Sequence, residues 1–164
     1  MKSIFFKVML VTNLFFICNC KAQIVNNYIN FYNNTISNLN PIISTKNQYY
    51  NLPFSNFYNE LQNGNINIQG WFYDTKISPS TKYYVLKLFL SDMNMLSIAS
   101  ENSYHDPRIS ITFKDEIPNQ VQTLMEQNHS QWNPVVAQFF SNIKVESIRF
   151  IGVRGYDSTD YSAK

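Results

Sequence analysis

Apolar residues recur at two different spacings along the chain, and each spacing predicts a different kind of element. Residues 24–39 place apolar side chains three or four positions apart, which is the spacing of one helix face. Because a residue before proline is pushed out of the helical region, we expect this helix to end just before Pro41. A second helix is expected over 56–62, with Ser55 as its cap and Gly64 just past its end.

The middle of the chain alternates apolar and polar residues at every second position, which is the period of a β-strand. Strands are expected over 65–74, 82–92, 96–100 and 108–113, with turns between them. The side chains expected to face the core are Ile66, Ile68 and Phe72 in the first strand, and Tyr84, Leu86, Leu88 and Leu90 in the second.

The last third of the chain returns to helical spacing. Asp115 and Glu116 precede Pro118, which suits a helix start. The helix is expected to break and restart at Asn133-Pro134, before a final strand over 144–153 and a polar tail from about residue 155. This order predicts an α+β fold, with a mainly antiparallel sheet of four to five strands and helices before and after the central strands.

The first residues have the pattern of an export signal. Lys2 and Lys7 precede an apolar run that is too short to span a membrane. Ile17-Cys18-Asn19-Cys20 resembles a loose bacterial lipobox, which implies a leader of residues 1–19 and a lipid anchor on Cys20. The alternative is cleavage after Ala22, which removes residues 1–22. Both cysteines of the chain lie in this segment, so we favour the anchor, followed by one mature domain over 20–164.

Charge and composition narrow the expected partners and location. Without Lys2 and Lys7, eleven basic residues balance eleven acidic ones, and no run of Lys or Arg could follow a phosphate backbone. We therefore expect no nucleic-acid partner, and contact with a membrane only through the lipid. The predicted location is the Gram-negative cell envelope, as an outer-membrane lipoprotein facing the periplasm. A soluble periplasmic or secreted protein is the alternative.

Candidate catalytic residues are few. His105, next to Asp106, and His129 could each work with a nearby carboxylate in acid–base chemistry. The stretch YHDP reads equally well as a turn in which Asp106 bonds nearby amides. No zinc-binding, nucleophile or phosphate-loop motif accompanies these residues, so we expect no cofactor and no metal.

The first hairpin offers a candidate binding surface. If the Ile66 and Leu86 sides of its strands face the core, the opposite sides gather Trp71, Tyr73, Tyr83 and Val85. A one-sided sheet normally carries polar residues there. Either residues 24–39 or 48–54 cover these rings, or the rings bind a glycan or a protein partner.

These features together predict a non-enzymatic binding protein of the envelope. Its partner would be an envelope protein or a glycan, and an inhibitor-like or immunity-type role is one form of this function. The alternative is a small envelope hydrolase that uses His105 or His129. Asp157-Ser158-Thr159 in the tail also resembles a short O-glycosylation sequon.

Overall fold

The computed structural model describes the backbone of residues 2–164 and the side chains from Gln23 onward. The expectations for the leader and for Cys20 therefore lie outside the described side chains. The described helices are α1 (Lys2–Thr45), the 3₁₀ helix η1 (Lys46–Tyr49), α2 (Phe54–Asn63), α3 (Met93–Glu101), α4 (Val121–Asn128) and α5 (Pro134–Phe140). The strands are β1 (Gly70–Thr75), β2 (Tyr83–Phe89), β3 (Arg108–Ile117) and β4 (Val145–Ile151). Within this part of the chain, no helix is both long and apolar enough to cross a membrane.

The strands form one antiparallel sheet in the order β1-β2-β3-β4, which confirms the α+β prediction. One row of paired apolar side chains crosses all the strands and is buried: Trp71, Leu88, Ile109 and Phe150. The adjacent row points to the other face and is exposed or half-buried: Phe72, Lys87, Ser110 and Arg149. The sheet therefore has one core face and one solvated face.

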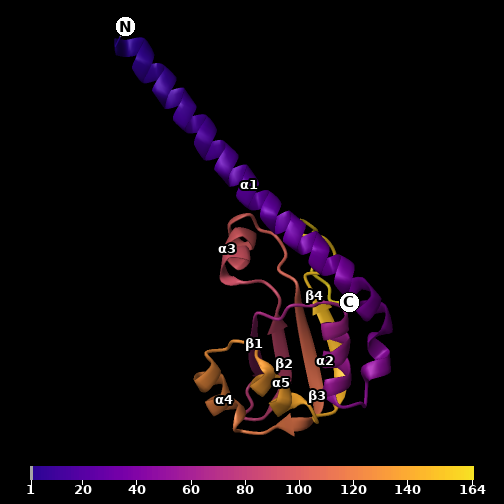
Figure 1. Ribbon diagram of the computed structural model, residues 1–164. Helices are drawn as coiled ribbons and strands as arrows, with labels where there is room; N and C mark the ends of the chain where they lie inside the picture. Colours follow the sequence, from indigo (N-terminus) through magenta and orange to yellow (C-terminus); the bar gives the residue numbers. More distant parts are fainter. Residues whose placement is uncertain (1) are drawn as a thin grey trace.

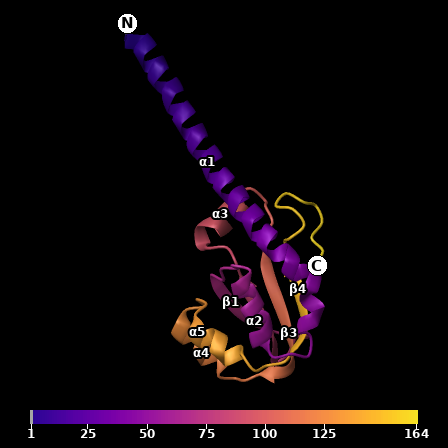
Figure 2. The same cartoon turned by 45° about the vertical axis from the view of Figure 1, so that its right-hand side comes forward.

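Aromatic rings from the helices fill the core face. Phe54 of α2 lies 5.9 Å from Phe113 of β3 and 6.4 Å from Phe140 of α5, measured between ring centroids. The C-terminal part of α1 adds Leu39 and Ile42 to the same buried cluster. Figures 1 and 2 show α1, α2 and α5 arranged around this side of the sheet.

The strand expected over 96–100 is wrong, because this stretch forms α3. The carboxylate of Asp92 accepts a hydrogen bond from the backbone N–H of Met95 at 2.8 Å and so caps the helix. A short apolar run is ambiguous between strand and helix, and here the cap decides the outcome.

The strand expected over 65–74 is shorter than predicted and changes its inward face at Gly70. Ile66 and Ile68 are buried as expected, but β1 begins only at Gly70. Trp71 then pairs with Leu88 on the core face, while Phe72 is 44% exposed. The prediction that Phe72 faces the core is therefore wrong.

Helix α1 continues through Pro41 to Thr45, so the expected end before Pro41 is also wrong. Ile42, one residue beyond the proline, is buried in the core. The hydroxyls of Ser44 and Thr45 donate to the carbonyl of Pro41 at 2.6 and 3.1 Å, which satisfies an acceptor in the last turn. Packing of this turn outweighs the conformational restriction that proline imposes.

The second helix is confirmed, but α2 begins at Phe54 rather than after Ser55. Pro53 occupies the cap position and makes no side-chain cap bond, and Gly64 follows the helix as expected.

Asp115 and Glu116 do not start a helix. They belong to β3, which continues to the buried Ile117, and α4 begins at Val121. The break at Asn133 is confirmed: its side chain accepts the first free amides of α5.

Candidate functional site

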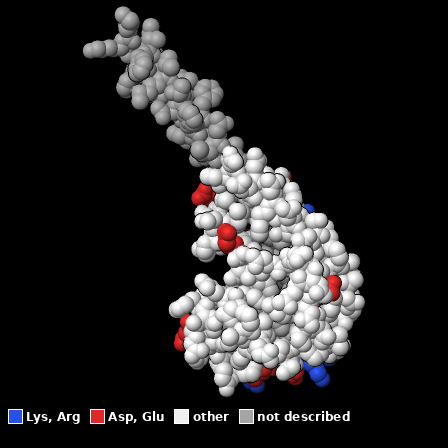
Figure 3. All heavy atoms as spheres, in the orientation of Figure 1, with Lys and Arg blue, Asp and Glu red and all other residues white. Residues whose placement is uncertain are grey.

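The connection between β2 and β3 carries α3 past the ends of the strands and leaves a cleft beside the sheet. Two cavities, of about 790 and 390 Å³, meet at Leu96 of α3 and at Asp106. We call them together the α3 cleft, and Figure 3 shows a hollow between α3 and the α4 end of the molecule. Helix α3 is held from its other side, where Ala99 packs with Tyr28 and Tyr32 of α1.

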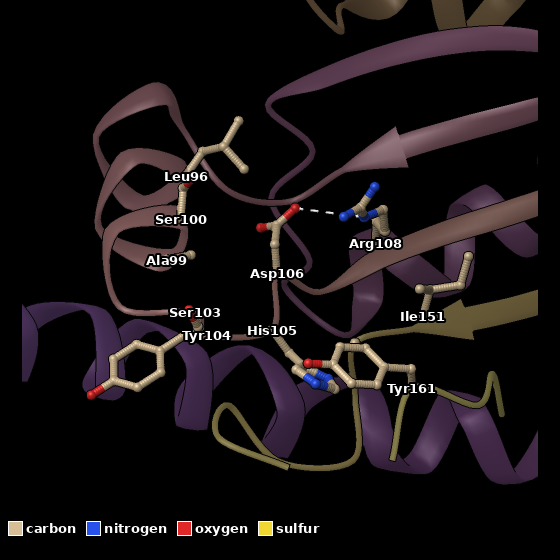
Figure 4. A pocket seen from close by; sticks show the side chains of 11 residues that line it. Leu96, Ala99, Ser100, Ser103, Tyr104, His105, Asp106, Arg108, Ile151 and Tyr161 are labelled. Atoms are coloured by element: carbon tan, nitrogen blue, oxygen red, sulfur yellow. Dashed lines mark ion pairs between the residues drawn. The ribbon is translucent and has the colours of Figure 1, made fainter. Parts of the chain in front are cut away.

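Asp106 and Ser91 form the polar centre of the α3 cleft. Each is only 7% exposed, and the Ser91 hydroxyl donates a hydrogen bond to the Asp106 carboxylate. Arg108 brings its Nε to 3.7 Å from the second carboxylate oxygen (Figure 4). The interpretation of YHDP as a turn in which Asp106 bonds nearby amides is wrong, since the carboxylate contacts a hydroxyl and a guanidinium instead.

Burial raises the pKa of Asp106, although the Ser91 hydrogen bond and the Arg108 charge both act to lower it. A buried carboxyl disfavours its charged form because the surrounding protein solvates charge less well than water does. Titratable groups with shifted pKa values in a cleft are candidates for functional roles. Asp106 is therefore the leading candidate for contact with a ligand.

We compare the free energy of unfolding of Asp106→Asn with that of the unmodified protein. We expect the variant to gain more stability at neutral pH than at acidic pH. With its pKa raised in the folded state, Asp106 adds stability below its unfolded pKa, and this contribution is lost as pH rises through the folded pKa. An amide cannot ionise, so the variant lacks this loss. Denaturant melts of both proteins at about pH 4 and about pH 7 measure the difference. An equal difference in the free energy of unfolding at both pH values would contradict the expectation.

Aromatic side chains wall the larger cavity. They include both tryptophans of the chain and two phenylalanines: Trp71, Trp132, Phe72 and Phe89. The backbone N–H of Trp71 donates to the carbonyl of Ser130 at 2.9 Å, which fixes the turn after α4 against β1. Among the described residues, the buried indole N–H of Trp71 has no hydrogen-bond partner. Such an unpartnered buried donor is unusual in a protein. A ligand could reach this N–H only if the ring moved, since the atom is closed to solvent.

The four hairpin residues predicted as a binding surface do not form one exposed platform. Trp71 is 1% exposed and packs against Phe140 of α5 at 5.5 Å. Tyr73 and Tyr83 meet at 4.5 Å and are half-buried against the same core. Val85 pairs with Asp74 on the solvated face. The change of face at Gly70 turns Trp71 and Tyr73 inward, and only Trp71 of the four lines the α3 cleft.

The two histidines lie at different ends of the site. His105 lines the smaller cavity, but its ring points away from the Asp106 carboxylate and stacks on Tyr161 at 4.4 Å (Figure 4). His129 lines the larger cavity, where it ends α4 in the left-handed conformation with φ 49°. In the described part of the chain, neither imidazole hydrogen-bonds a carboxylate, and no His, Cys, Asp or Glu cluster is arranged as a metal site.

Comparison with protein-family models, with curated proteins and with solved structures finds no match to this chain. The functional argument therefore rests on the residues of the α3 cleft.

Proposed function

We propose that this chain is a non-enzymatic binding protein whose α3 cleft takes a neutral oligosaccharide. The observation that carries the proposal is the combination, in one cleft, of aromatic walls with the buried Asp106–Ser91 pair. Its larger cavity of about 790 Å³ is of a size typical of small-molecule sites.

The chemistry of a sugar ring suits both parts of this cleft. A pyranose presents C–H groups on its faces, which pack against aromatic rings such as Phe72 and Phe89. Its hydroxyls donate and accept hydrogen bonds at its edges, where Asp106 and Ser91 offer complementary groups. Figure 3 shows acidic but no basic side chains on the rims of the hollow, and Asp92 and Asp106 line the larger cavity, which disfavours an anionic ligand.

Titration with the β-1,4-linked tetramer of N-acetylglucosamine tests the proposal. Since both tryptophans line the cleft, we expect a saturable change in their fluorescence. Phe72→Ala should weaken binding about fivefold through loss of ring contact. The matched control is Ile77→Ala, which removes an exposed apolar side chain from the β1–β2 turn and should leave the affinity unchanged. Absence of a saturable signal would overturn the proposal.

We further propose that the protein is exported to the cell envelope and anchored through Cys20. The positive residues Lys2 and Lys7, the apolar run after them and the lipobox-like Ile17–Cys20 support this proposal. Cys20→Ala is expected to release the protein from the membrane fraction and to abolish labelling with a fatty-acid analogue. Native protein that begins with an unmodified Gln23 would instead establish cleavage after Ala22.

A further inference from the structure

A third cavity, of about 300 Å³, continues the α3 cleft toward α1. It shares Asn67, Gln69 and Asp92 with the larger cavity of the cleft, so the two cavities lie side by side. We call this part the amide groove, because side-chain carboxamides dominate its polar lining: Asn34, Asn38, Asn65, Asn67 and Gln69.

The sequence places these carboxamides together through two periodicities. Along 65–69, burial alternates at every residue, so that Ile66 and Ile68 enter the core and leave the carboxamides between them exposed. On α1, Asn34 and Asn38 are four positions apart and therefore share one face of the helix. Both sets of side chains line the same cavity.

Hydrogen bonding leaves these groups free for a ligand. Within the described part of the chain, none of the five carboxamides hydrogen-bonds another side chain or the backbone through its own side chain. Each offers both a donor and an acceptor. Asp92 is the charged residue of the lining, and its carboxylate already caps α3. The groove is thus polar but nearly uncharged.

We infer that the amide groove binds the acetamido groups of an extended N-acetylated oligosaccharide whose other end occupies the α3 cleft. This inference rests on the proposed function. An acetamido group carries one N–H donor and one carbonyl acceptor, which is the complement of a carboxamide side chain. Apolar side chains of the same groove, Phe31 and Met95, would contact its methyl group.

The test varies the length and the acetylation of the oligosaccharide. Calorimetric titration of the protein measures the affinity for each sugar. We expect the N-acetylglucosamine hexamer to bind about tenfold more tightly than the dimer, because it alone reaches both parts of the groove. The glucose hexamer of the same linkage should lose most of this gain. The double variant Asn34→Ala/Asn38→Ala, whose two residues line the amide groove but not the α3 cleft, should weaken the hexamer about tenfold and leave the dimer within about twofold.

The matched control is Asn119→Ala/Asn142→Ala, which removes two exposed asparagines outside the groove. Thermal melts should show that neither double variant is destabilised, since all four asparagines are exposed. If the dimer binds and the hexamer binds no more tightly, the amide groove is overturned while the proposed function stands. Equal binding of both sugar hexamers overturns acetamido recognition. If no oligosaccharide binds, both proposals fail.

Discussion

Gly152→Ala is expected to destabilise the protein by about 2–5 kcal/mol and to disrupt the α3 cleft at the same time. Gly152 has φ +70°, and a Cβ atom there would lie 2.4 Å from the carbonyl oxygen of Asp106. The left-handed conformation costs a non-glycine residue about 1–2 kcal/mol, and forced overlap in a packed region adds about 1–3 kcal/mol. Because the overlap is with the backbone of Asp106, relief of the strain must displace the polar centre of the cleft.

Hydrogen bonds hinder any movement of Gly152 away from this contact. The Tyr32 hydroxyl donates to the carbonyl of Gly152 at 2.8 Å and accepts from the backbone N–H of Gly155 at 2.9 Å. Tyr32 is itself buried on α1, so the segment is fixed from two sides. A shift large enough to admit a methyl group would break these bonds as well.

Gly64→Ala is the matched control for this substitution. Gly64 has an ordinary φ of −78°, and its added Cβ would meet the end of the Ile42 side chain at 2.9 Å and two backbone carbonyl oxygens at 3.3 and 3.7 Å. A side-chain methyl can rotate away, so we expect a much smaller loss. Denaturant melts measure the stability of both variants, and tetramer titration measures the cleft. A loss at Gly152 no larger than that at Gly64 would contradict the predicted clash.

The fold could be predicted where local periodicity and tertiary burial agree. The alternation of Leu86 and Leu88 identifies the core face of β2, and the same face is buried in β3 and β4. At Gly70 the agreement ends. Ile66 and Ile68 occupy even positions and Trp71 an odd one, yet all three are buried, so strict alternation does not continue through Gly70. Such a change depends on how β1 meets the turn at Ser130, and no pattern within the strand records that contact.

The candidate site was harder to predict, because its polar centre joins residues that no motif connects. Ser91 and Asp106 are 15 positions apart and meet only because β2 and β3 pair in one register. Once Phe89 is known to lie opposite Arg108, continuing the antiparallel pairing places Ser91 opposite Asp106. The register of this hairpin is therefore the signal that could have identified the site. Trp132 enters the cleft from a distant turn, which gave no signal of its own.

Trp71→Ala is expected to destabilise the protein by about 3–5 kcal/mol, as much as a core substitution does. Its ring is 1% exposed, packs against Phe140 and lies opposite the buried Leu88. Leu88→Ala is the reference, with an expected loss of about 2–5 kcal/mol. Denaturant melts of the two variants side by side make the comparison. A loss at Trp71 well below that at Leu88 would support the exposed binding platform that the sequence suggested.

Trp71→Phe separates the role of this ring in the core from its role in the cleft. Phenylalanine keeps most of the apolar packing but removes the unpartnered indole N–H, so the loss of stability should be clearly smaller than for Trp71→Ala. If the N–H donates to the ligand, affinity for the N-acetylglucosamine tetramer should fall about three- to tenfold, the worth of one hydrogen bond. Calorimetric titration measures this without relying on tryptophan fluorescence. Unchanged affinity would show that the indole N–H does not contact the sugar, and that Trp71 serves the core alone.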